Sequence, residues 1–218
     1  MKKRILILTK SFKHNARCVV GFDIDNFELI RLVTSDKSIH FSLTTNHLKY
    51  NNNKTVNLLD IAEINFIGKQ YNINQPENWI IDETKKFVKL DIEQNERINI
   101  FRQLKEFISN EDYIYLNTNE YLTKELYNKI NKSISLHIIE NIKFHIYQSA
   151  FSPNPRVKIS FEYNGQQYDN FSFTSDDSDF KDCKKAIAII TLPDGNDEFC
   201  IKKEQYYKFV AQIYKLKS

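Results

Sequence analysis

The chain has 218 residues, of which 41% are hydrophobic and 27% are charged, and its formal net charge is +3. This composition supports a folded core and excludes a globally disordered chain. Its 4 glycines form neither of the Gly-rich patterns that cradle nucleotide phosphates, which excludes the Rossmann and P-loop classes.

The first third of the sequence predicts antiparallel strands. Runs of Ile, Leu, Val and Phe occur at Arg4–Thr9, Arg17–Ile24, Glu28–Thr34 and Val56–Phe66. The polar pair Asp25-Asn26 is typical of a hairpin turn between the second and third runs. No helix is expected before residue 90.

The middle of the sequence changes to a helical period. Apolar residues recur at helical spacing up to Ile108, which predicts a helix over Gln94–Ile108. A second helix is predicted beyond Asn119, whose side chain could cap its first turn.

Strand patterns return after Ser133. The dipeptide Asn164-Gly165 tolerates the positive φ angles of a type I′ turn and is the strongest hairpin signal in the chain. The final segment, Gln205–Leu216, fits either a helix or a strand. The strands predicted in this part are Ser135–Ile139, Ile142–Tyr147, Arg156–Tyr163, Gln167–Thr174, Ala186–Leu192 and Glu198–Lys202.

Together these elements predict a mainly β (α+β) fold, in which two small antiparallel β-barrels or sandwiches are joined by a helical segment. The expected divisions are 1–92 for the first β domain, 93–132 for the helical connector and 133–218 for the second β domain. The second β domain would end in a helix or a strand.

The three cysteines, Cys18, Cys183 and Cys200, are widely spaced and form no C-x-x-C pair. They predict neither a disulfide framework nor a zinc site, and they fit a reducing compartment. The apolar run Ile5–Leu8 is too short for a secretion signal, and no run approaches the roughly 20 residues of a membrane helix. We therefore expect a cytoplasmic protein without a membrane partner.

Five short motifs occur in order along the first part of the chain, namely Ser11-Phe12-Lys13, Cys18-Val19-Val20-Gly21, Leu29-Ile30-Arg31, Leu59-Asp60-Ile61 and Gln75-x-x-Asn78-Trp79. Their order and spacing resemble the dual OB-fold domain family of bacterial proteins, as do the later segments RVKISFEYNGQQYDNFSFTSDD and KAIAIITL. Two positions depart from the family pattern, because Val20 stands where it has Ala and Leu29 where it often has Trp.

The resemblance implies a pair of OB-like barrels and, by analogy with other OB folds, binding of nucleic acid. It also implies a place in bacterial systems that act on foreign or mobile nucleic acid. It implies no catalytic residue and no cofactor. We therefore expect a non-catalytic module that binds nucleic acid, most simply a single strand. The alternatives are an adaptor that docks a partner enzyme from the same operon, and a metal-dependent nuclease.

The basic N-terminal segment is the first candidate for a nucleic-acid interface. Residues 1–22 contain six Lys or Arg side chains and no Asp or Glu. OB barrels bind single strands by combining a cationic groove with aromatic faces. The alternative is that these basic side chains are solvated and protect sheet edges from aggregation. The candidate residues are Lys10, Ser11, Phe12, Lys13, His14, Arg17 and Arg31.

Gln75, Asn78 and Trp79 form a second candidate patch. The indole could stack on a base and the amides could read one. A lone Trp in a small domain is, however, more typical of a core residue, and the amides could cap a turn instead.

Candidate catalytic and metal sites meet geometric objections. Asp60 and Glu63 could hold a divalent ion, but positions three apart on a strand point to opposite faces. Cys18 and His14 could form a nucleophile and base, but a Cys beside two valines is typical of a buried hydrophobic residue. The aspartates around residue 180 lack the Gly and Glu of a calcium loop. We expect no metal.

Overall fold

The computed structural model describes residues 1–13, 15–108, 114–148, 155–176 and 179–216. The chain forms two compact units. The first consists of Met1–Asn72 and Pro76–Phe107, and the second of Ile73–Gln75 and Ile108–Ser218. The predicted connector 93–132 is thus divided between the units and does not form a separate one.

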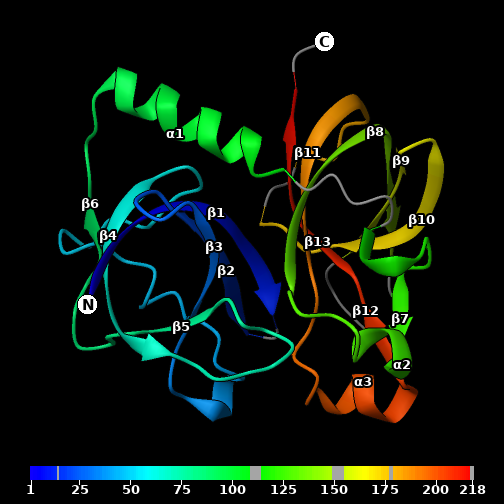
Figure 1. Ribbon diagram of the computed structural model, residues 1–218, viewed down its shortest axis with the longest axis horizontal. Coiled ribbons are helices and arrows are strands. Elements are labelled where there is room, and N and C mark those ends of the chain that lie inside the picture. The colour runs from blue at the N-terminus through cyan, green and yellow to red at the C-terminus, as the bar shows by residue number, and fades with distance from the viewer. Residues whose placement is uncertain (14, 109–113, 149–154, 177–178, 217–218) are drawn as a thin grey trace. The chain divides into compact units, whose positions relative to one another are not determined.

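In its described residues the first unit has six strands, of which five close into a barrel (Figure 1). The strands are β1 (Lys2–Lys13), β2 (Ala16–Asp23), β3 (Glu28–Val33), β4 (Ile61–Lys69), β5 (Asn78–Ile81) and β6 (Val88–Lys89). Around the ring the order is β1-β2-β3-β5-β4 and back to β1, with β6 paired to β4. The β3–β5 pair is parallel and the other pairs are antiparallel.

Alternation along β1 produces the interior of this first barrel. Ile5 and Ile7 are fully buried in one apolar cluster with Val19, whereas the intervening side chains point to the other face of the strand. On β2, Gly21 lies opposite Ile7. A Cβ atom at Gly21 would lie 2.2 Å from Cγ2 of Ile5, so glycine permits the close approach of the two strands.

Five strands of the second unit also close into a barrel. They are β8 (Ile134–Tyr147), β9 (Arg156–Tyr163), β10 (Gln166–Phe173), β11 (Cys183–Thr191) and β13 (Phe209–Lys215). The ring runs β8-β9-β10-β13-β11 and returns to β8. The turn between β9 and β10 confirms the hairpin prediction, since Asn164 and Gly165 have φ angles of 49° and 71°.

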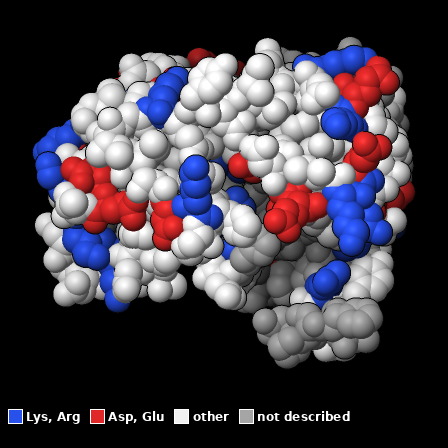
Figure 2. Space-filling model, turned by 90° about the horizontal axis from the view of Figure 1, so that it is seen from below, with Lys and Arg blue, Asp and Glu red and all other residues white. Residues whose placement is uncertain are grey.

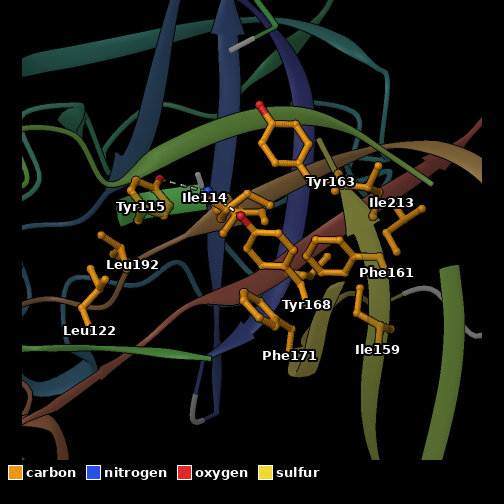
Figure 3. Packing of buried hydrophobic residues seen from close by; sticks show 14 of the residues in the cluster. Ile114, Tyr115, Leu122, Ile159, Phe161, Tyr163, Tyr168, Phe171, Leu192 and Ile213 are labelled. Carbon is orange, nitrogen blue, oxygen red and sulfur yellow. Dashed lines mark hydrogen bonds between the residues drawn. The ribbon is translucent and has the colours of Figure 1, made fainter. Parts of the chain in front are cut away.

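Aromatic rings fill the second barrel (Figure 3). Phe161 and Tyr168 stack with their ring centroids 5.3 Å apart, and Phe171 meets both rings edge-on. The hydroxyl oxygen of Tyr168 accepts a hydrogen bond from the backbone N–H of Ile114 at 3.3 Å. The core thereby fixes the chain segment that leads into this barrel.

The two barrels share one strand order. In each, the first strand pairs with the second and the fourth, the second with the third, and the third with the fifth in parallel. This is a five-stranded Greek-key barrel of the OB type. The prediction of a mainly β chain with two OB-like barrels is confirmed.

The remaining elements are short, apart from one helix. Helix α1 (Gln94–Glu106) confirms the helical prediction and ends two residues early. No described helix has the length and apolar character needed to cross a membrane. The other elements are η1 (Lys37–Ile39), η2 (Ile114–Leu116), β7 (Tyr121–Thr123), α2 (Lys124–Tyr127), α3 (Glu198–Lys203) and β12 (Gln205–Tyr207).

Three local predictions need correction, and one open alternative is decided. Asn119 caps no helix, because β7 follows it and Thr123 caps the short α2 through its hydroxyl. Glu198–Lys202 is helical, since Asp197 Oδ1 accepts the backbone N–H of Cys200 in the first turn. Of the two alternatives for Gln205–Leu216, the strand is confirmed, since the segment forms β12 and β13 with Leu216 just beyond the second.

The third correction concerns Val56–Phe66, of which only the part from Ile61 onward is strand. Asp60 Oδ2 accepts the backbone N–H of Asn57 at 2.8 Å, and Leu59 has a φ angle of 63°. This turn interrupts the apolar run, so β4 begins only after it.

Candidate nucleic-acid interface

Phe12 and Arg17 lie directly opposite each other near the tip of the β1–β2 hairpin. The guanidinium carbon of Arg17 lies 3.9 Å from the centroid of the Phe12 ring. Phe12 nevertheless keeps 55% of its surface exposed. The hairpin therefore presents an aromatic ring and a cation together, in a geometry favourable for a cation–π contact.

Lys10 extends the same face of the hairpin. A β-bulge between Ile7 and Thr9 shifts the alternation of β1 by one residue, and Lys10 pairs with Val19 of the barrel core, so Lys10 and Phe12 continue the inward-facing row toward the barrel end. The Nζ atom of Lys10 donates a hydrogen bond to the carbonyl oxygen of Val56 at 2.9 Å. We call Lys10, Phe12 and Arg17 the hairpin site.

The alternate residues of the hairpin point the other way. Ser11 is 3% exposed, and its hydroxyl donates to the carbonyl oxygen of Cys18 at 3.4 Å. Lys13 is half-buried, and its Nζ atom donates to the carbonyl oxygen of His40 at 3.0 Å. Strand alternation thus separates these two candidates from the hairpin site. His14 lies outside the described residues.

Arg31 does not reach the surface, because only 5% of it is exposed. It pairs with Val20 in the middle of the sheet, between β2 and β5, and its Nη1 donates to Sγ of Cys18 at 3.4 Å. Its guanidinium is therefore not available to a phosphate in this fold.

The first three basic residues of the chain are neutralised by ion pairs. Lys2 bonds Glu63 at 2.7 Å, Lys3 bonds Asp23, and Arg4 bonds Asp25 and Glu96. The N-terminal concentration of charge therefore produces no continuous basic surface. On the face drawn in Figure 2, basic and acidic side chains likewise lie side by side.

The second candidate patch is buried. Trp79 is 8% exposed and its ring centroid lies 5.9 Å from that of Phe66. The side-chain amide of Asn78 donates to Gln70 at 2.7 Å. Gln75 belongs to the second unit, where its amide donates to the carbonyl oxygen of Leu192 at 3.2 Å. The three side chains act in folding and not at a shared surface.

The carboxylate of Asp60, the key residue of the nuclease alternative, is already occupied. It accepts hydrogen bonds from Tyr50, Lys89 and the backbone N–H of Asn57. Burial raises the pKa of Asp60, but these bonds outweigh it, so the pKa lies below its ordinary value. Within the described residues, no group of three or more His, Cys, Asp or Glu side chains could hold a metal ion.

A second basic hairpin, β8–β9, was not among the candidates from the sequence. Its outward face includes Lys143, Tyr147 and Arg156, which are exposed. The signal that could have found it is the absence of Asp and Glu from residues 141–161, which matches the absence from residues 1–22.

The family model of the dual OB-containing domain matches residues 3–213, nearly the whole chain. A search of curated proteins and a search of solved structures each found no match. The two closed five-stranded rings, with their shared strand order, agree with the two OB folds of that domain. The chain therefore belongs to the dual OB-containing domain family.

Proposed function

We propose that this protein is a non-catalytic module that binds single-stranded nucleic acid through the hairpin site of its first barrel. The family supports nucleic-acid binding in general, since OB folds commonly bind oligonucleotides. The exposed ring and the cations of the hairpin site support the choice of this surface within the first barrel.

The observation that carries the proposal is the exposed Phe12 ring beside the Arg17 guanidinium. Bases stack on such rings at roughly 1–3 kcal/mol per base, with little dependence on sequence. A phosphate next to the stacked base can pair with Arg17 or Lys10. Stacking and charge pairing on one short hairpin are the two contributions that unspecific single-strand binding requires.

The absence of catalysis is part of the proposal. It is supported by the saturated Asp60 carboxylate, which donors from three different residues already use. Participation in a bacterial system that acts on foreign or mobile nucleic acid follows from the family resemblance alone and stays a prediction.

Fluorescence anisotropy with a labelled oligo(dT) and the matching RNA tests the proposal at low salt. The double variant Phe12→Ala/Arg17→Ala should bind at least about tenfold more weakly than the wild type. Phe27→Ala is the matched control, because Phe27 is 41% exposed in the same unit but follows the opposite end of β2. Equal losses in the two variants would contradict the assignment of the site.

The adaptor alternative predicts a different result. In that case no oligonucleotide binds, and a partner protein forms a complex that persists at high salt, because strand addition relies on backbone hydrogen bonds. The same purified protein and salt series distinguish the two functions.

A further inference from the structure

The second barrel begins with the hairpin that corresponds to β1–β2 of the first. β8 and β9 are the first two strands of their ring, as β1 and β2 are of theirs. In both hairpins the part nearest the tip comes from sequence without acidic residues, 1–22 in one case and 141–161 in the other, and Asp23 on β2, Glu140 on β8 and Glu162 on β9 lie just outside these runs. Asp and Glu make up 28 of the 218 residues, so runs without them are unexpected. Two such runs at corresponding hairpins indicate that both hairpins require the absence of negative charge.

The register of β8 against β9 gathers polar side chains on one face. His145 lies opposite Lys158, Tyr147 opposite Arg156, and Lys143 opposite Ser160. The alternate pair, Phe144 and Ile159, faces the barrel interior, where Ile159 is fully buried. The side chains of the first three pairs therefore all point outward. We call Lys143, His145, Tyr147, Arg156 and Lys158 the β8–β9 face.

Two of its three cations are not neutralised by the described part of the chain. Lys158 pairs with Glu120 at 2.8 Å. Lys143 and Arg156 are exposed, and no described carboxylate lies within ion-pair distance of either. Tyr147, which lies directly opposite Arg156, is 48% exposed.

Two acidic groups, Glu162 and Asp182, lie where this face ends. Both line a surface pocket together with Lys143. Asp182 accepts the backbone N–H of Phe144 at 2.9 Å, on the edge of β8. The surface charge thus changes from positive on the hairpin arm to negative on the next residues of the barrel wall. A bound polyanion would therefore extend no farther than this boundary.

We propose that the β8–β9 face is a second surface for single-stranded nucleic acid, in which Lys143 and Arg156 bind phosphates and Tyr147 stacks on a base. The inference rests on the proposed function and extends it to the second barrel. An exposed ring between unneutralised cations favours nucleic acid over an acidic peptide, because a base stacks on the ring whereas a peptide carboxylate makes no stacking contact with it.

The test uses the full chain and a labelled oligo(dT) of about 20 nucleotides, which is long enough for OB-fold sites of roughly 4–16 nucleotides. The double variant Lys143→Gln/Arg156→Gln should reduce the slope of log K against log salt by about 1.4. The matched control, Lys202→Gln/Lys203→Gln, removes the same charge from exposed positions on α3 and should leave the slope unchanged.

Tyr147→Ala measures the stacking contribution separately. It should weaken oligo(dT) binding by about 5- to 100-fold and leave the binding of an abasic strand of equal length unaffected. Ultraviolet crosslinking of oligo(dT) to the wild type, followed by peptide mapping, should label the peptide that contains Tyr147.

The outcomes separate this inference from the proposed function. If the wild type binds oligo(dT), and only Phe12 and Arg17 variants weaken it, the β8–β9 face is overturned and the hairpin site stands. If no oligonucleotide binds, both fail. Competition by polyglutamate as effective as that by unlabelled oligo(dT) would assign the face to acidic proteins and overturn the inference.

Discussion

The Nζ atom of Lys3 donates a hydrogen bond to the Asp23 carboxylate, and at most 5% of either side chain is exposed. The ammonium also lies 4.4 Å from the centroid of the Trp79 ring. Burial disfavours charge on both groups. Their mutual bond outweighs burial only together with the bonds from Lys3 to Glu28 and from Asn26 and the backbone N–H of Asp25 to Asp23, so the pKa of Asp23 lies below its ordinary value and that of Lys3 above its own.

Asp23→Ala should therefore destabilise the first barrel by about 3–5 kcal/mol, since it leaves the buried ammonium of Lys3 with only the partly exposed Glu28. Asp25→Ala is the control. Asp25 pairs with Arg4 at the surface, where an ion pair contributes at most about 1 kcal/mol. Urea unfolding of the two variants measures the difference, and similar losses would show that the buried pair has no special role.

Gly21→Ala should destabilise the first barrel by at least about 1–3 kcal/mol, because the new methyl group would overlap Cγ2 of Ile5. The same substitution at Gly68 meets no atom within 4 Å and should change stability by less than about 1 kcal/mol. Thermal unfolding of both variants provides the comparison. A tolerated Gly21→Ala would mean that β1 and β2 are farther apart than described.

The second barrel should lose stability in mild acid because of His137. This residue is fully buried, its Nε2 lies 2.8 Å from the Ser135 hydroxyl, and no hydrogen-bond partner is described for its Nδ1. Burial, with a smaller effect from Lys132, lowers the pKa of His137 to about 3.

The direction of this pH dependence of stability follows from proton uptake. Below about pH 6.5 the unfolded chain protonates this histidine while the folded chain does not, so stability falls as the pH drops. The loss should reach about 2 kcal/mol at about pH 5 relative to pH 8. His137→Gln should lose less over the same range. Denaturant unfolding at the two pH values checks this, and equal pH dependence of both proteins would exclude the histidine as the cause.

The sequence predicted the architecture better than the local elements. The architecture was predicted from sequence patterns that the structure retains. These are strand alternation, the Asn164-Gly165 turn and the OB resemblance. The helix α3 and strand β13 were harder, because short segments that mix apolar and polar residues fit both periods and tertiary pairing decides between them.

The candidate site could be predicted only in part, because the sequence pattern does not show which side chains meet in the fold. Charge density identified the N-terminal segment, but it could not show that Lys3 and Arg4 meet carboxylates from distant segments. Nor could it show that β3 lies between two other strands, which buries Arg31. Phe12 and Arg17 could be paired only once the register of the hairpin was known.

The salt dependence of oligo(dT) binding tests the central claim most directly. If Lys10 and Arg17 each neutralise one phosphate, their double Ala variant should have a slope of log K against log salt that is shallower than the wild-type slope by about 1.4. A control double variant at Arg102 and Lys105, which are exposed in the same unit, should keep the wild-type slope. An identical slope in the wild type and the hairpin variant would contradict the account.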